Sequence, residues 1–163
     1  MLIDPTDTEA SISLLHSLKL TDQKLKVCCV GDFVEDTDEF ARSEVVLKIK
    51  TAMAVGETVV LINSGPIRSS FYDVFNRHFA MLAVESNEVE DAKTQYYANV
   101  AVGSFSRPCV VDPNFKIIVH MPISSLSGTQ LPFLNRFEKY ILSVEDALQE
   151  KIQKRNPSER EEY

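Results

Sequence analysis

Three short runs made almost wholly of apolar residues constrain the fold of this chain more than any other feature. They are KLKVCCV (24–30), with its apolar end at Val27–Val30, TVVLI (58–62) and FKIIV (115–119). Runs of this length without polar alternation are typical of strands buried on both faces of a parallel sheet. Segments with helical patterns alternate with them. We therefore predict an α/β layered fold with a mainly parallel sheet flanked by helices and joined by right-handed crossovers.

The segments between these runs carry helix signals. The capping-box pair Thr6 and Glu9 predicts a helix over 6–20, and the stripe that begins at Val45 predicts a second helix that ends at Gly56. Pro66 should begin a third helix that extends to about residue 79. Its predicted apolar face consists of Ile67, Phe71, Val74, Phe75 and His78, with the histidine packed in the core.

The second half of the chain predicts a hairpin and a final helix. YYANVAV (96–102) and the run 108–111 flank Gly103 and Ser104, which predicts an inserted β-hairpin. KYIL (139–142) should form a short last strand. Ser143 with Asp146 should then cap a helix that ends in a polar tail.

Composition excludes several classes of protein. The chain has 163 residues, 44% of them apolar and 25% charged, as expected for one folded domain. A net charge of −7 argues against a nucleic-acid-binding surface. The apolar runs are far shorter than the roughly 20 residues of a transmembrane helix, and MLIDPTDTEA lacks the basic and apolar character of a secretory signal. The three cysteines match no zinc or redox spacing and are interpreted as small buried side chains, so we expect a cytoplasmic location.

The block LPFLNRFEKYIL (131–142) holds the most informative single side chain, Arg136. Pro132 begins an apolar turn, and we expect Leu131, Phe133, Leu134 and Phe137 to surround the arginine with buried groups. A guanidinium held on a stiff platform can present its planar donors to a phosphate on a neighbouring molecule or module. The alternative is a structural arginine that pairs with Glu138 or another acid.

The devices that a P-loop ATPase needs are missing or altered. The chain has five glycines and no G-x-x-x-x-G-K-[ST] motif. The strand TVVLI ends in Ile62 and Asn63, where the Walker B position of an active enzyme has acids for magnesium and for the attacking water. The strand FKIIV runs into Pro122, where a polar sensor residue would stand.

Three blocks, in this order, resemble AAA+ modules. DPNFKIIVHMP (112–122) is similar to the "HPNFRLFATMNP" block of dynein- and midasin-type modules. GETVVLINSGPIRSSFYDVFNRHF (56–79) and LPFLNRFEKYIL resemble a degenerate module of the mysterin-type family, which are giant AAA+ ATPases with a RING ubiquitin ligase domain. The matching order and spacing run from about Lys24 to Leu142.

The resemblance implies a partial, P-loop NTPase-like AAA+ fold with a β-hairpin insertion and the start of a lid helix. It implies an uncertain N-terminal helix at 1–23, a degenerate core at 24–142 without the P-loop strand, and a lid helix and tail at 143–163. In the AAA+ strand order, the absent strand would lie between the strands 115–119 and 139–142, so KYIL would be detached.

The same resemblance implies that this chain is a non-catalytic segment, in which Arg136 serves as an arginine finger for a neighbouring ATP site. ATP and magnesium would bind in neighbouring modules, and the chain itself would hold no cofactor or metal. Its partners would be adjacent AAA+ modules and, through the parent protein, components of the ubiquitin pathway.

Two other functions remain open at this point. The chain could be a stand-alone α/β binding or scaffold domain without nucleotide chemistry. It could also be a small enzyme that uses Asp73, Asp112 or Glu138 for acid–base chemistry, although none of these acids sits in a nucleophile or metal pattern.

Overall fold

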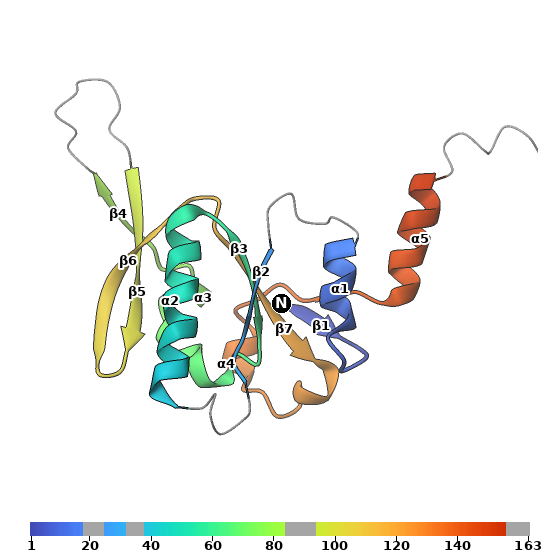
Figure 1. Ribbon diagram of the computed structural model, residues 1–163, viewed down its shortest axis with the longest axis horizontal. Helices are drawn as coiled ribbons and strands as arrows, with labels where there is room; N and C mark the ends of the chain where they lie inside the picture. Colours follow the sequence, from blue (N-terminus) through green and yellow to red (C-terminus); the bar gives the residue numbers. More distant parts are fainter. Residues whose placement is uncertain (18–24, 32–37, 84–93, 156–163) are drawn as a thin grey trace, which may run out of the picture. The chain divides into compact units, whose positions relative to one another are not determined.

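The computed structural model describes residues 1–17, 25–31, 38–83 and 94–155 (Figure 1). The chain folds as two compact units: a central unit, residues 23–119, and a terminal unit, residues 1–22 with 120–163. Strand β7 (Lys116–Pro122) contributes its first four residues to the central unit and its last three to the terminal unit. We describe each unit by itself.

The central unit contains the three parallel strands that the apolar runs predict. β2 (Leu25–Cys29) pairs with β3 (Thr58–Ile62), and β3 pairs in turn with the first half of β7. Every residue of β3 is buried, which explains why this strand has no polar alternation. The expected mainly parallel α/β fold is confirmed.

Helix α2 (Glu39–Val55) covers these strands and ends at the predicted Gly56. Asp38 caps its N-terminus, because the Asp38 carboxylate accepts a hydrogen bond from the Ala41 amide at 2.6 Å. Gly56 ends it in the left-handed conformation with φ of 76°. The buried side chains of the helix are Val46, Ile49, Ala52 and Met53.

The helix predicted over 66–79 is wrong in length and type. The segment forms a 3-10 helix η2 (Gly65–Phe71) followed by one turn of α-helix, α3 (Tyr72–Phe75). The chain then turns at Arg77, whose φ is 54°, and enters a strand β4 (Ala80–Ala83) that the sequence pattern did not predict. His78 is exposed and not in the core. The other predicted core residues, Ile67, Phe71, Val74 and Phe75, are buried.

The predicted hairpin is present and forms a second sheet with β4. β5 (Thr94–Val102) and β6 (Phe105–Val111) pair antiparallel around Gly103, and β4 pairs antiparallel with the other edge of β5. Gly103 has a φ of 59°, a conformation that glycine adopts without strain. In Figure 1 the hairpin and α2 lie side by side, in agreement with the contacts between α2 and β6.

The terminal unit is built on a short parallel sheet with the order β7-β1-β8. β1 (Leu2–Asp4) pairs on one side with His120–Pro122 of β7 and on the other with β8 (Tyr140–Ile141). Its helical elements are α1 (Ala10–Ser17), η3 (Ile123–Ser125), α4 (Leu131–Leu134) and α5 (Val144–Arg155). Ser143 and Asp146 cap α5 as predicted, with Oγ to Oδ2 at 2.8 Å.

Two expectations about this unit are wrong. β1 occupies the place, between β7 and β8, that the expected strand order reserves for the P-loop strand, so the sheet is not missing a strand there. For the same reason the KYIL strand is paired rather than detached. The predicted helix over 6–20 is observed as α1 from Ala10, and residues 18–20 lie outside the described residues.

Candidate functional site

The turn that follows β1 is organised around a buried carboxylate, that of Asp4. Its Oδ1 accepts hydrogen bonds from the Thr6 amide at 2.8 Å and the Thr6 hydroxyl at 2.6 Å. Its Oδ2 lies 3.2 Å from the Ser11 amide, at the start of α1, and 3.1 Å from His120 Nε2. The Asp4 side chain has no exposed surface, so protein donors have replaced its solvent.

The segment from Asp4 to Ser11 has the length of a Walker A motif. Its eight residues place Glu9, Ala10 and Ser11 where G-x-x-x-x-G-K-[ST] has its second glycine, its lysine and its hydroxyl residue. Glu9 has a φ of 62°, a left-handed conformation that favours glycine. The turn therefore keeps the spacing, one glycine-like backbone conformation and the hydroxyl residue, but it lacks the lysine.

Ser11 has a different partner from the one a P-loop serine would have. Its hydroxyl donates to the Leu142 carbonyl at 3.0 Å, and the residue is 1% exposed. In a P-loop this hydroxyl coordinates magnesium. Here it cross-links the start of α1 to the segment that follows β8.

His120 brings a second polar group to Asp4 from the neighbouring strand β7. The register of β1 and β7 pairs Asp4 with Pro122 and Leu2 with His120. Because a carboxylate oxygen only accepts, Nε2 carries the proton in this contact. The ring is 3% exposed, and its Nδ1 has no hydrogen-bond partner among the residues that the structure describes.

The surroundings of Asp4 favour its charged form. Burial alone would raise the pKa of this carboxyl, but the hydrogen bonds from Thr6, His120 and Ser11 outweigh that effect and hold the pKa well below its ordinary range. Asp4 is therefore an anion at neutral pH. Sequence analysis missed both Asp4 and His120, and the signal available was a polar residue at the end of each of two adjacent strands.

The predicted Walker B position lies at the end of β3. Ile62 is buried, and the Asn63 amide donates to the Val30 carbonyl at 2.7 Å. Asn63 has a φ of 51°, which asparagine tolerates better than most residues. This side chain joins the ends of β2 and β3, and it offers no carboxylate.

The predicted sensor position, Pro122, ends β7 and precedes η3. Its ring has no polar group. Alternate residues of a strand point to the same face, so His120, two residues before Pro122, supplies the polar side chain on this face. Asp4 and His120 are thus brought together in the terminal unit, while Ile62 and Asn63 belong to the central unit.

Arg136 follows α4 in the terminal unit and is half-buried. Its backbone amide donates to the Phe133 carbonyl at 3.3 Å. Phe133 and Leu134 are buried and Phe137 packs edge-on against Phe133, with ring centroids 5.1 Å apart. Phe137 is half-buried and Leu131 is 70% exposed, so two of the four apolar residues expected around the arginine are buried.

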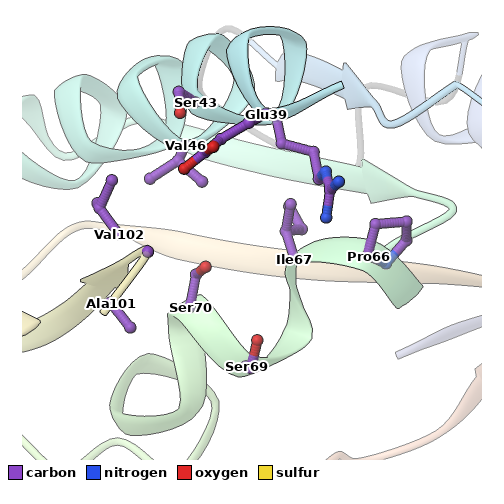
Figure 2. Close-up of a pocket in the computed structure, with 11 residues that line it drawn as sticks. Glu39, Ser43, Val46, Pro66, Ile67, Ser69, Ser70, Ala101 and Val102 are labelled. Carbon is purple, nitrogen blue, oxygen red and sulfur yellow. The ribbon is translucent and has the colours of Figure 1, made fainter. Parts of the chain in front are cut away.

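The central unit also has an open pocket of about 400 Å³, with residues from α2, η2 and the β5–β6 hairpin (Figure 2). Figure 2 shows Glu39, Ser43 and Val46 from α2, Ser69 and Ser70 from η2, and Val102 from the hairpin around the same space. The pocket's charged lining residues are one acid and one cation, Glu39 and Arg42, and the lining includes no histidine or cysteine. It therefore indicates no particular reaction.

The three acids considered for an independent enzyme have local roles or none that points to catalysis. Asp112 accepts hydrogen bonds from the Asn114 amide and side chain, and Glu138 accepts one from the Tyr140 hydroxyl at 2.6 Å. Asp73 lies on α3.

Of the cysteines only Cys28 is buried, and burial raises the pKa of its thiol. No group of three potential metal ligands occurs in the described ranges.

Comparison with known proteins identifies the family. The family model described as RNF213 AAA domain matches residues 1–148. A putative uncharacterized transmembrane protein of Dictyostelium discoideum is 42% identical over 154 residues, which cover 94% of this chain and 2% of the relative. The E3 ubiquitin-protein ligases RNF213 of Homo sapiens and Mus musculus are 28% and 23% identical, over 82% and 88% of this chain.

The chain corresponds to 2% or 3% of the length of these relatives. Within the described residues, no helix has the length and apolar character needed to cross a membrane. The match to the family model covers both the turn around Asp4 and the Arg136 block. The chain therefore belongs to the RNF213 AAA domain family, of the mysterin-type AAA+ class that the sequence blocks resemble.

Proposed function

We propose that this chain is a catalytically silent AAA+ segment of an RNF213-like protein, in which it supports the ATP-hydrolysing modules on either side. The observation that carries the proposal is the turn 4–11, which has P-loop length but has Ala10 in the place of the lysine that binds phosphates. The magnesium-binding hydroxyl is used by Ser11 to bond Leu142, and the Walker B and sensor positions hold Asn63 and Pro122.

This proposal makes ATP and magnesium ligands of neighbouring modules rather than of this chain. Calorimetry with Mg-ATP on the 163-residue chain is the direct test, and we expect no heat of binding at low micromolar protein. A one-site isotherm would refute it. A ubiquitin ligase role and a cytoplasmic location would then be properties of the parent protein, as the name of the RNF213 relatives suggests for the first.

We further propose that Arg136 is an arginine finger for the ATP site of an adjacent module. Phe133 and Leu134 anchor the turn before it, and the Phe133–Phe137 contact stiffens the turn after it. This packing suits an arginine finger, because an arginine whose backbone is already held in place loses little conformational entropy when its guanidinium binds the phosphate in the transition state. A finger supplied in trans accelerates hydrolysis by about 10³–10⁵-fold in known NTPases.

The test is Arg136→Lys in a full-length parent protein. Lysine keeps the charge and the aliphatic stem but lacks the planar donor fork. We expect a loss of ATP turnover of at least about tenfold with an unchanged melting temperature. Arg77→Lys, at an exposed arginine of the central unit, is the matched control and should leave turnover unchanged. Unchanged turnover in Arg136→Lys, with a lowered melting temperature in Arg136→Ala, would assign the residue a structural role.

A further inference from the structure

We infer that the Asp4 carboxylate is a built-in ligand, which occupies the anion-binding cradle of this AAA+ module in place of a nucleotide phosphate. The inference deepens the proposed silent role and rests on it, because it names what fills the site when nucleotide does not bind. It concerns the terminal unit alone and involves only described residues.

The position of the carboxylate is the first argument. In a P-loop the backbone amides at the start of the helix point at the phosphates, and the partial positive charge of the helix N-terminus adds to the attraction. Here the Ser11 amide at the start of α1 points at Asp4 Oδ2, 3.2 Å away, and the Thr6 amide points at Oδ1, 2.8 Å away. A side-chain anion thus lies where the motif would hold a bound one.

His120 supplies an independent argument. The ring is almost completely buried, yet within the part of the chain that the structure describes only Nε2 of its two nitrogens has a partner, and that partner is Asp4. Leaving Nδ1 without a partner has a cost. The ring is therefore best explained as a donor for the carboxylate, which it reaches from the strand that carries the sensor residue in an active module. Four donors on three residues, Thr6, Ser11 and His120, converge on one anion.

The consequence for nucleotide binding is exclusion by charge and by volume. The Asp4 side chain is ionised and has no exposed surface, so a phosphate could enter only if it displaced the carboxylate and left it without its donors. A phosphate and the Asp4 carboxylate in the same cradle would repel each other, and the low dielectric of the buried site would strengthen this repulsion. The cradle is consequently closed to nucleotide even without considering the missing lysine.

Removal of the carboxylate should reopen the cradle to small oxyanions. In Asp4→Gly the donors Thr6 N, Ser11 N and His120 Nε2 lose their acceptor, and formate is the smallest carboxylate that could replace it. We expect sodium formate, compared with sodium chloride at equal ionic strength, to raise the melting temperature of Asp4→Gly in a saturable way. The wild-type chain should show no such specific rise.

Asp7→Gly is the matched control, because Asp7 is an exposed acid of the same turn and also has a positive φ, of 56°. It should melt identically in formate and chloride. Inorganic phosphate is tested in a second series of melts. If phosphate stabilises Asp4→Gly as formate does, the cradle accepts phosphate, which is the group that a P-loop binds. If formate stabilises this variant and phosphate does not, the cradle has room for a carboxylate but not for a phosphate. Absence of any anion-specific stabilisation in a folded Asp4→Gly chain would overturn the inference.

A measurement on the wild-type chain keeps the inference testable if Asp4→Gly does not fold. In amide NMR spectra at pH 7, the Thr6 and Ser11 signals should not move when inorganic phosphate is added to 50 millimolar (about the level that reveals weak sites). Saturable shifts at both amides would mean that the cradle is open, which contradicts an internal ligand. This outcome is distinct from failure of the proposed function, which depends on Mg-ATP binding and on Arg136 in the parent protein.

Discussion

The ends of strands β1 and β3 satisfy their polar groups in opposite ways. At the end of β1 the chain has a buried charge, Asp4, that gathers donors from its own turn, from α1 and from His120. At the end of β3 it has a neutral amide, Asn63, which donates a hydrogen bond to the Val30 carbonyl just after β2. One end is rebuilt around an internal anion, and the other around a backbone cross-link.

This difference follows from what each end must satisfy without a ligand. A loop at a helix N-terminus exposes backbone amides that need an acceptor when phosphate is absent, and a carboxylate supplies it. The end of a buried strand exposes carbonyls, which need a donor, and an asparagine amide supplies that. At both strand ends, side chains of the protein therefore make the hydrogen bonds without a bound ligand.

The largest predicted effect concerns the charged end. Asp4→Asn should lower the free energy of unfolding by about 3 kcal/mol, because the amide group places a donor against at least one of the four donors that now bond to the carboxylate. For a chain of this size that corresponds to a fall of about 6–12 °C in the melting temperature. Thermal melts with the exposed Asp7→Asn as control check it. Equal melting of the two variants would remove the contrast between the two strand ends.

The neutral end should be less sensitive. Asn63→Ala should lower the free energy of unfolding by about 2 kcal/mol, of which about half is the lost bond to Val30 and half the cost of alanine at positive φ. Asn63→Gly separates the two contributions, since glycine accepts the backbone conformation but makes no bond. Urea titrations of both variants measure them. A loss in Asn63→Ala larger than that in Asp4→Asn would reverse the comparison.

The two ends should also differ in their response to acid. A depressed pKa means that the contribution of Asp4 is fully present above the unfolded pKa of about 3.9 and is lost as pH falls below it. The difference in unfolding free energy between wild type and Asp4→Asn should therefore shrink by about 1 kcal/mol between pH 7 and pH 3. The corresponding difference for Asn63→Gly should stay constant over that range, because no carboxylate is removed. Urea titrations at both pH values provide the measurement.

Sequence reasoning predicted β2, β3 and β7 because each is a short apolar run, although only β3 is buried at every residue and β2 and β7 are partly exposed. It missed β1, which is only three residues long, LID, and is defined by pairing with segments more than 100 residues away. It extended the helix after Pro66 because the 3.6-residue pattern continues past Phe75. The left-handed turn at Arg77 and the pairing of β4 with β5 override that pattern.

The candidate site was only half predictable for a related reason. The positions Asn63, Pro122 and Arg136 could be located because the sequence blocks around them resemble those of the family, although Asn63 and Pro122 themselves depart from its pattern. The turn from Asp4 to Ser11 has the length of the motif but neither its glycines nor its lysine, so a search of the sequence for the motif does not find it. The His120–Asp4 contact joins residues 116 positions apart, and no local signal encodes it.

The smallest predicted effect tests whether the turn still has a P-loop backbone. Glu9 holds the left-handed conformation where the motif has glycine, and a side chain there costs about 1–2 kcal/mol. Glycine would relieve this strain but would add flexibility to the unfolded chain, so Glu9→Gly should raise the free energy of unfolding by about 0.5 kcal/mol. Thr8→Gly, at an adjacent exposed residue without positive φ, should lower it by about the same amount. Opposite signs for these neighbours in urea titrations would support an inherited glycine position, whereas destabilisation by both would mean that Glu9 is not strained.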